Sequence, residues 1–282
     1  TLGAYLDAFD PADVLLPGGL SPDGVVRGLV SPHIDYGRGG PVYRAIWQVA
    51  ADAARHADLA IIFGTDHSGG PGKITLTGQN YATPYGVLPN AREVTQAVAD
   101  ALGHEDAFEE ELHHRNEHSI ELAGVWLHHV RRGAPIEVVP ILCGSFAHFV
   151  AGRADPAEDV RIAKTIEALA QSTGDRSVLV IAAADLAHIG PAFGGAPAHV
   201  HQRAVLKRAD ETLLDQMSAG DAEGFFGALR DVGDHNNVCG LPPIYLALRL
   251  LGDVRGAAVA YDQCPADERN TSWVSVAGLV WH

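Results

Sequence analysis

Short, continuous runs of apolar residues alternate with segments of helical periodicity along this 282-residue chain. The apolar runs are rich in β-branched residues and end in Gly, Pro or Asp. The segments between them repeat their apolar positions every three to four residues, as amphipathic helices do. Continuously apolar strands are typical of parallel sheets that helices cover on both faces. The alternation therefore predicts an α/β fold with a central, mostly parallel mixed sheet flanked by helices on both faces.

The same patterns place the elements along the chain. Strands are expected at residues 24–33, 58–68, 136–144, 176–188, 256–264 and 271–282. Helices are expected at residues 41–57, 90–103, 117–133, 155–171, 199–217, 221–230 and 241–251. The last two strands are candidates for an antiparallel edge. The Gly/Pro-rich loops at 19–24 and 190–199 are too short to be domain linkers, so we expect one domain over residues 1–282.

Charge and composition exclude several classes of partner. The formal net charge of −15 argues against nucleic acids and anionic membranes, because both attract a basic surface. No apolar run reaches the roughly 18 residues of a membrane helix, and the N-terminal segment lacks the pattern of a secretory signal. The three cysteines form no CxxC pair. We therefore expect a cytoplasmic protein, and the abundance of Arg, Ala and Gly suggests a bacterial source.

Three of the expected strands are followed at once by histidines and aspartates. In sheets of this kind, ligands bind outside the carboxyl ends of the strands, so these side chains should converge there. Converging imidazoles favour a metal site, a proton relay or both. One such histidine would be an ordinary loop residue, but three are harder to dismiss. The residues are His33 and Asp35, Asp66 and His67, and Asp185 and His188.

Cys239 is a further candidate for this cluster. It lies in the segment DHNNVCGLPP (234–243), between asparagines and a glycine, directly before an expected helix. A thiol at a helix N-terminus has a lowered pKa, which favours a thiolate nucleophile or metal ligand. The alternative is a buried structural cysteine, a common role for this residue. Cys143 ends an expected strand and is assigned to the core.

Residues 114–118 spell H-x-x-E-H, the pattern of inverted zinc proteases. On one helix, His114 and His118 would share a face and Glu117 would act as general base. We disfavour this interpretation because short patterns recur by chance in a histidine-rich chain. Other motifs fail: Ile74 occupies the Ser/Thr position of a phosphate loop, and neither G-x-G-x-x-G nor G-x-S-x-G is present.

Seven blocks of the sequence together resemble the MEMO family, whose prokaryotic members are often labelled AmmeMemoRadiSam system protein B. Each block is weakly specific alone, but their order matches that of the family over residues 28–282. The blocks are SPHIDYGRGG, IIFGTDHS, NEHSIEL, IEVVPILCG, AADLAHIG, NNVCGLPPI and SWVSVAGLVWH. The resemblance implies the fold of class III extradiol (LigB-like) dioxygenases, which are non-haem iron enzymes.

The resemblance also implies a set of site residues. Where those dioxygenases bind Fe(II) with two histidines and a glutamate, a cysteine replaces the carboxylate, so the metal ligands would be His33, His67 and Cys239. Asp185 and His188 match the acid/base region. The resemblance would place His118, and with it Glu117, at the pocket wall. Because thiolate is softer than carboxylate, copper or zinc would compete with iron.

The leading functional hypothesis is a metal-dependent oxidoreductase, related to the dioxygenases, that acts on a small organic substrate. Fe(II) is the expected metal, with copper or zinc as alternatives and O₂ as a candidate co-substrate. His188 would be the general acid or base, with Asp185 or another carboxylate orienting its ring. His118 would be a second acid/base group or a substrate contact. Asp35, Tyr36 and Glu117 are assigned to substrate binding.

Two alternatives from other classes stay open. One is a non-catalytic protein whose degenerate dioxygenase pocket binds a metal or a peptide. The other is a zinc-dependent hydrolase that uses either the same three ligands or the H-x-x-E-H pattern. The prokaryotic family label also implies a functional link to a radical-SAM enzyme. Glycine- and tyrosine-containing segments at 37–43 and 78–86 are expected to shape the mouth of the pocket.

Overall fold

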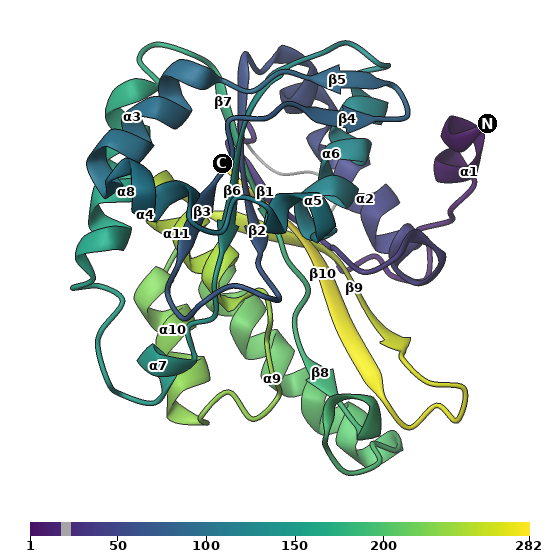
Figure 1. The fold of residues 1–282 in the computed structure, drawn as a ribbon. Coiled ribbons are helices and arrows are strands. Elements are labelled where there is room, and N and C mark those ends of the chain that lie inside the picture. Colours follow the sequence, from purple (N-terminus) through teal and green to yellow (C-terminus); the bar gives the residue numbers. More distant parts are fainter. Residues whose placement is uncertain (18–23) are drawn as a thin grey trace.

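Four parallel strands form the centre of the sheet in the computed structural model of the chain, which describes residues 1–17 and 24–282 (Figure 1). Their order is β6–β2–β7–β1, and all neighbours among them are parallel. The bounds are β1 Gly28–Ser31, β2 Leu59–Thr65, β6 Glu137–Cys143 and β7 Val178–Ala183. These strands are buried almost throughout, as expected for a sheet that is covered on both faces.

Antiparallel strands extend the sheet on both sides. β3 (Ile74–Leu76) pairs with β6 at one end. At the other end, β10 (Trp273–Trp281) pairs with β1, with β9 (Gly256–Pro265) and with the short β8 (His188–Ile189). β4 (Tyr81–Thr83) and β5 (Gly86–Leu88) form a separate hairpin. The predicted fold class is confirmed, and the last two strands are antiparallel as anticipated.

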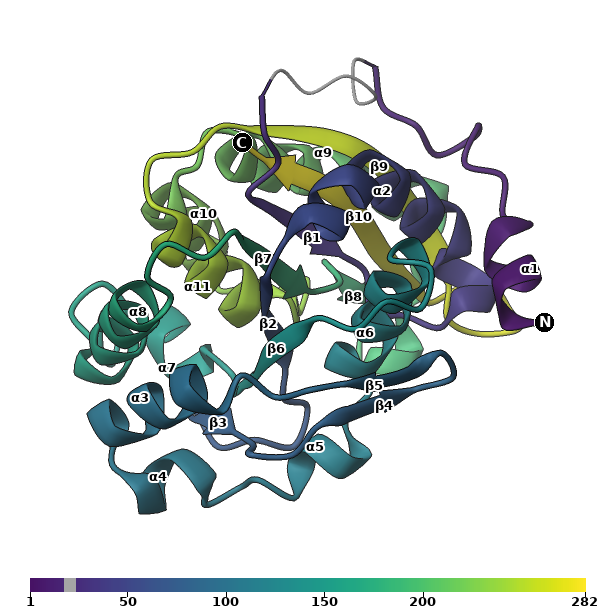
Figure 2. The ribbon, with the colours of Figure 1, turned by 90° about the horizontal axis from the view of Figure 1, so that it is seen from above.

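Helices cover the two faces of the sheet (Figure 2). α2 (Tyr36–His56) and α6 (Ser119–Val130) pack on one face. The other face is covered mainly by α3 (Arg92–Leu102), α8 (Val160–Ser172), α9 (Val200–Ser218), α10 (Ala222–Asp231) and α11 (Leu241–Leu251). The remaining helices are α1 (Leu2–Asp7), α4 (His104–Phe108), α5 (His113–Asn116), α7 (Ala147–Val150) and the 3₁₀ turn Pro191–Phe193. Within residues 1–17 and 24–282, none of the helices combines the length and apolar character that a membrane crossing requires.

Three helices differ clearly from their predicted bounds. α8 begins at Val160 rather than residue 155, because the Asp159 side chain accepts hydrogen bonds from the Arg161 and Ile162 backbone N–H groups and caps the helix there. α2 begins at Tyr36 rather than residue 41, because the Asp35 side chain accepts a hydrogen bond from the Arg38 backbone N–H and caps the helix earlier. The helix expected at 117–133 runs only from Ser119 to Val130, and His114 lies on the separate short helix α5. Of the two loops considered as linkers, residues 19–23 lie outside the described part of the chain, and 190–199 contains the 3₁₀ turn.

The carboxyl ends of the parallel strands lie level at one edge of the sheet. Thr65 at the end of β2 pairs with Cys143 of β6, and Ser31 at the end of β1 pairs with Ala183 of β7. The residues that follow these ends emerge together, which explains how positions far apart in the sequence form one site.

Candidate metal centre

His33, His67 and Cys239 meet at this edge of the sheet. The Cys239 sulfur lies 3.3 Å from His33 Nε2, and one potential ligand atom from each residue lies within 4.8 Å of the others. The two imidazole rings are 5.2 Å apart and nearly perpendicular. Two ligands that share one metal ion are separated by roughly 3–4 Å, given metal–ligand bonds of about 2.0–2.3 Å. The structure thus brings together the three residues that the sequence singled out as candidate ligands.

His33 is held in a single tautomer by the end of β7. Its Nδ1 lies 3.0 Å from the Ala183 carbonyl oxygen, which can only accept a hydrogen bond. Nδ1 therefore carries the proton, and Nε2 presents a lone pair toward Cys239. His33 is almost fully buried, and this burial lowers its pKa despite the opposing charge of Asp185. A neutral ring with a free Nε2 is the form that binds metals.

Glu117 fixes the second histidine in the same way. Its Oε2 accepts hydrogen bonds of 3.0 Å from both the backbone N–H and Nδ1–H of His67. This leaves His67 Nε2 free. A carboxylate behind a histidine is the usual outer partner of a metal-binding imidazole, because it sets the tautomer and raises the basicity of the ring.

The other carboxylate oxygen of Glu117 organises the start of α6. Oε1 accepts hydrogen bonds from the backbone N–H groups of His118 and Ser119, and His118 Nδ1 lies 3.1 Å away. Burial alone would raise the pKa of Glu117, but the hydrogen bonds from His118 and His67 outweigh it and hold the pKa far below the usual carboxyl range. Since five N–H groups surround this carboxylate, it serves to orient the histidines rather than to bind a metal or a substrate.

His118 closes one side of the centre. Its ring stacks on that of His67 at 5.2 Å and meets the ring of His33 edge-on at 5.6 Å. The side chain is half-exposed, and its hydrogen bond to Glu117 raises its pKa. His118 is therefore the most accessible proton donor beside the three candidate ligands.

Asp185 connects two of the candidate ligands through the backbone. Its Oδ1 accepts hydrogen bonds from the backbone N–H groups of His33 and Ile34, while Oδ2 lies 3.7 Å from His33 Nε2. Its carbonyl oxygen accepts a hydrogen bond from the Gly240 N–H, next to Cys239. Asp185 thus positions both the His33 loop and the Cys239 loop.

Close backbone packing places Cys239. A Cβ on Gly240 would lie 2.3 Å from the Asp185 carbonyl oxygen, so only glycine allows this approach. Asp234 and Asn237 adopt positive φ, which Asp and Asn tolerate better than most residues. Thr65 at the end of β2 donates a hydrogen bond to the Cys239 carbonyl.

The expected lowering of the Cys239 pKa is wrong for the protein without metal. Burial raises the pKa of this thiol well above its usual value, and the negative charge of Asp185 adds to the effect. The position before the Gly240 cap of α11 does not compensate. A bound cation would reverse this balance, because coordination deprotonates a thiol.

His188 lies farther along the same edge, on β8. Its Nδ1 donates a hydrogen bond to the Leu186 carbonyl oxygen at 3.2 Å. The prediction that a carboxylate orients this ring is therefore wrong: the ring is oriented by the backbone. Burial lowers the pKa of His188, while the charge of Asp185 opposes the shift.

Asp35 and Tyr36, assigned to substrate binding, have structural contacts instead. Asp35 caps α2 and forms an exposed ion pair with Arg38. The Tyr36 hydroxyl donates to the Leu122 carbonyl at 2.8 Å, and its ring packs edge-on against Tyr43 and Trp126. No contact in the described structure connects either residue with the three candidate ligands.

The H-x-x-E-H pattern does not form a zinc site. His114 Nδ1 accepts a hydrogen bond from the Tyr81 hydroxyl at 2.7 Å, and its Nε2–H donates to the Thr75 carbonyl at 3.0 Å. Both nitrogens are thus occupied, and Glu117 orients His67 and His118 instead. Tyr81 lies in the segment 78–86 that was expected at the pocket mouth, and that segment forms the β4–β5 hairpin.

A second polar cluster, which the sequence did not reveal, lies behind His67. His113 Nδ1 donates to Asp66 Oδ2 at 2.9 Å and lies 3.9 Å from Glu110 Oε2. The hydrogen bond to Asp66 raises the pKa of His113. Only the helix α5 brings His113 to the end of β2, and no local pattern predicts that approach.

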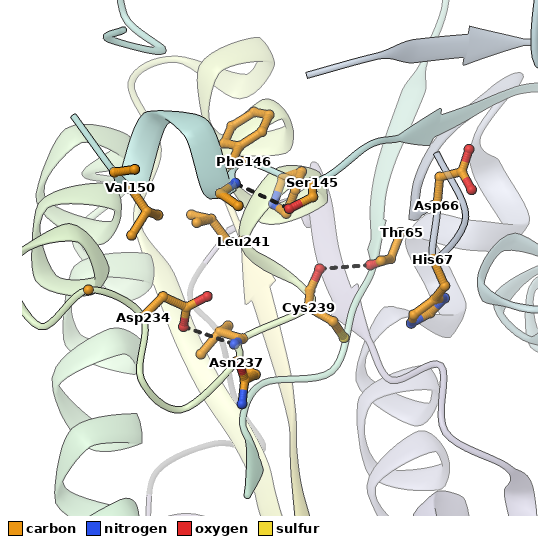
Figure 3. A pocket seen from close by; sticks show the side chains of 15 residues that line it. Thr65, Asp66, His67, Ser145, Phe146, Val150, Asp234, Asn237, Cys239 and Leu241 are labelled. Carbon is orange, nitrogen blue, oxygen red and sulfur yellow. Dashed lines mark hydrogen bonds between the residues drawn. The ribbon is translucent and has the colours of Figure 1, made fainter. Parts of the chain in front are cut away.

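A cavity of about 510 Å³ adjoins the centre (Figure 3). Thr65, His67 and Cys239 line one side of it. The opposite side comes from α7, the start of α11 and the loop before Cys239. The volume lies within the usual range for small-molecule sites.

Comparison with known proteins identifies the family of the chain. The family model of Memo-like proteins matches residues 12–280. The chain belongs to the Memo-like protein family. A MEMO1 family protein of Methanosarcina acetivorans is 26% identical, covering 84% of this chain and 78% of the relative. A MEMO1 family protein of Thermococcus onnurineus is 29% identical over 78% of this chain and 75% of its own length.

This membership agrees with the family resemblance found in the sequence. The candidate ligands of this Memo-like protein all lie within the matched residues, as do Glu117, Asp185 and His188. Cys143, assigned to the core, is buried at the end of β6.

Proposed function

We propose that this Memo-like protein is a metal-dependent oxidoreductase whose metal, expected to be Fe(II), is held by His33, His67 and Cys239. The observation that carries the proposal is the convergence of two imidazole nitrogens and one sulfur. Each imidazole donates its Nδ1 proton to a fixed acceptor, the Ala183 carbonyl or the Glu117 carboxylate. A neutral imidazole pair with a thiol is a donor set for a transition metal and not for Mg²⁺ or Ca²⁺.

Three protein ligands would leave further coordination positions for small molecules, and a redox-active metal would supply one-electron chemistry there. The protein's own groups would control protons around it. His118, with its raised pKa and half-exposed ring, would deliver a proton from solvent to the centre. Glu117 would keep His118 oriented and charged. His188, neutral and partly buried, would accept a proton on Nε2.

A zinc hydrolase that uses the H-x-x-E-H pattern is not proposed, since His114 is fully engaged by Tyr81 and Thr75. Zinc or copper on the three proposed ligands is tested together with iron. If the protein binds a metal but shows no redox activity, we would conclude that it is a non-catalytic binding protein.

The first experiment measures metal binding. Protein purified without added metal would be reconstituted anaerobically with Fe(II), Cu(I) or Zn(II), and bound metal would be measured by mass spectrometry. We expect about one ion per chain and a loss of tenfold or more in affinity in Cys239→Ser. Cys264→Ser is the matched control, because Cys264 is also buried and its thiol donates a hydrogen bond to the Arg38 carbonyl instead of facing the centre. Equal metal content in both variants would refute the assigned ligands.

The second experiment measures turnover. Oxygen uptake by the Fe(II)-loaded protein would be recorded with catechol-like and amino-acid-derived substrates. Oxygen uptake by the unaltered protein would support the oxidoreductase. Slower uptake by His118→Gln at unchanged metal content would support the role of His118. Absence of uptake with every metal would overturn the oxidoreductase and leave a metal-binding protein.

A further inference from the structure

The cavity beside Cys239 has an apolar wall. Phe146, Val238 and Leu241 are buried and line it together with Val150 and Pro242 (Figure 3). This wall faces the side formed by His67 and Cys239. Removing an apolar group from water against such a wall is favourable by roughly 25 cal/mol for each Å² buried, so the cavity favours a ring or alkyl group.

Its charged groups are acidic. Among the described residues that line the cavity there is no Lys or Arg, and the carboxyl groups are those of Asp66 and Asp234. Asp66 is already paired with His113. The Asp234 carboxylate accepts a hydrogen bond from the Val238 backbone N–H at 2.9 Å, and it forms no ion pair with a Lys or Arg of the described structure. Its neighbour His235 is exposed and turns Nδ1 toward the Val232 carbonyl.

We propose that this cavity is the substrate subsite and that it selects a small aromatic or aliphatic amine, whose ammonium group pairs with Asp234 while its apolar part lies against Phe146, Val150 and Leu241. The proposal rests on the proposed function, because the substrate would lie beside Cys239 and His67. Partial burial raises the pKa of Asp234, which agrees with a carboxylate that lacks a cationic partner. A carboxylate or phosphate substrate would meet repulsion from Asp234 and no Lys or Arg among the described residues that line the cavity.

Three phenols that differ in the charge of their para substituent test the charge selectivity: tyramine, p-cresol and 4-hydroxyphenylacetate. Their affinities would be measured by calorimetry on metal-free and metal-loaded protein. We expect tyramine to bind about tenfold more tightly than p-cresol, and 4-hydroxyphenylacetate to bind most weakly. Similar affinities for the cation and the anion, or no binding of any probe, would overturn the proposal.

Two variants locate the binding site. Asp234→Asn keeps the acceptor for Val238 and tolerates the positive φ, so it should remove the preference for tyramine while leaving p-cresol binding unchanged. Asp231→Asn is the control, because this nearby aspartate is exposed and pairs with Arg230. Val150→Trp should fill the cavity and weaken all three probes at unchanged metal content. A retained tyramine preference in Asp234→Asn would place the amine elsewhere.

The proposed function and the proposed substrate class can be refuted independently of each other. Probe binding to metal-free protein tests the cavity, whereas metal content tests the three proposed ligands. Tyramine binding without metal binding would overturn the proposed function alone. Metal binding and oxygen uptake without charge selectivity would overturn the substrate class alone.

Discussion

Glu117 is the residue whose role is most specific to this centre, although it need not touch a metal. Its carboxylate accepts hydrogen bonds from both His67 and His118. Glutamine at this position would present an NH₂ group to N–H donors and leave His67 Nδ1 without its partner. We therefore expect Glu117→Gln to lower metal affinity by about 10- to 100-fold, measured by competition with a chromogenic chelator.

The control for this prediction is Glu121→Gln. Glu121 is exposed in the first turn of α6, only four residues after Glu117, and its substitution by Gln removes the same charge. The Glu121→Gln variant should change the metal affinity by less than about twofold, as expected of an exposed surface charge. Equal losses in the two variants would mean that net charge, and not the orientation of His67, determines the affinity.

At this scale the sequence predicted the positions of His33, His67 and Cys239 because strand ends and a cysteine before a helix are local signals. It did not predict which groups form hydrogen bonds with these side chains. Glu117 was assigned to substrate binding because nothing local shows that its carboxylate faces backbone N–H groups. The Cys239 pKa was assigned the wrong direction because the sequence does not reveal burial or the charge of Asp185.

At the scale of elements, the loop between α10 and α11 depends on close contact with the end of β7. Gly240→Ala would place its Cβ 2.3 Å from the Asp185 carbonyl and 2.8 Å from the Ala184 Cβ. The loop must then move, and Cys239 with it. We expect a loss of about 1–3 kcal/mol in the free energy of unfolding, together with weakened metal binding.

Denaturant unfolding and metal titration of the same protein check this prediction. Gly252→Ala gives a comparison without a nearby clash, since its Cβ position is open, although its positive φ makes alanine strained there. If Gly240→Ala loses stability but binds metal as the unaltered protein does, the contact supports the fold and not the position of Cys239.

His114 connects α5 to the segment β3–β4 through its two hydrogen bonds. Burial lowers its pKa to about 4, so the folded protein keeps the ring neutral while the unfolded chain protonates near pH 6.5. The unfolded state therefore binds more protons between these values, and stability falls as pH falls from 6.5 to 4. His114→Ala should cost about 2 kcal/mol at pH 7.5.

This cost should shrink at pH 5, because only the unaltered protein carries the acid-dependent loss. Urea unfolding of both proteins at the two pH values tests the expectation, and metal content should stay unchanged. Loss of bound metal in His114→Ala would instead support a zinc site at the H-x-x-E-H pattern. A constant difference in stability would mean that His114 titrates normally in the folded protein.

Long elements were predictable and short ones were not. The buried strands are continuous apolar runs, and α3, α8, α9, α10 and α11 show clear periodicity over many residues. β8 has two residues, and β4 and β5 have three each, which is too short for a periodic signal. The predicted start of α2 is five residues too late because Asp35 caps the helix, and a single capping residue is a weaker signal than apolar spacing.

At the scale of the whole molecule, one sheet separates two hydrophobic cores and carries the candidate centre at one edge. One core lies under α2 and α6, and the other lies under α3 and α8 to α11. The two covering layers therefore meet at the centre: α6 begins beside Glu117, and α11 begins beside Cys239. Sequence patterning could predict the layers, but not which loops of the two layers would come into contact.

A buried acid of α9 should contribute to the pH dependence of global stability with the opposite sign to His114. Asp210 of α9 is almost fully buried and accepts a hydrogen bond from the Tyr261 hydroxyl of β9 at 2.8 Å. Burial raises its pKa to about 6 from an ordinary value of 3.8. Between these values the folded protein binds more protons than the unfolded chain, so stability falls as pH rises from 4 to 6.

Asp210→Asn removes this charge while keeping an acceptor for Tyr261. The variant should therefore gain stability relative to the unaltered protein as pH rises, by up to about 3 kcal/mol above pH 7, since each pKa unit corresponds to about 1.4 kcal/mol. Urea unfolding at pH 4, 6 and 8 measures the difference. Asp215→Asn, an exposed position on the same helix, should show no such trend. Parallel pH profiles for the Asp210 variant and the unaltered protein would mean that Asp210 ionises in the folded state as readily as in the unfolded chain.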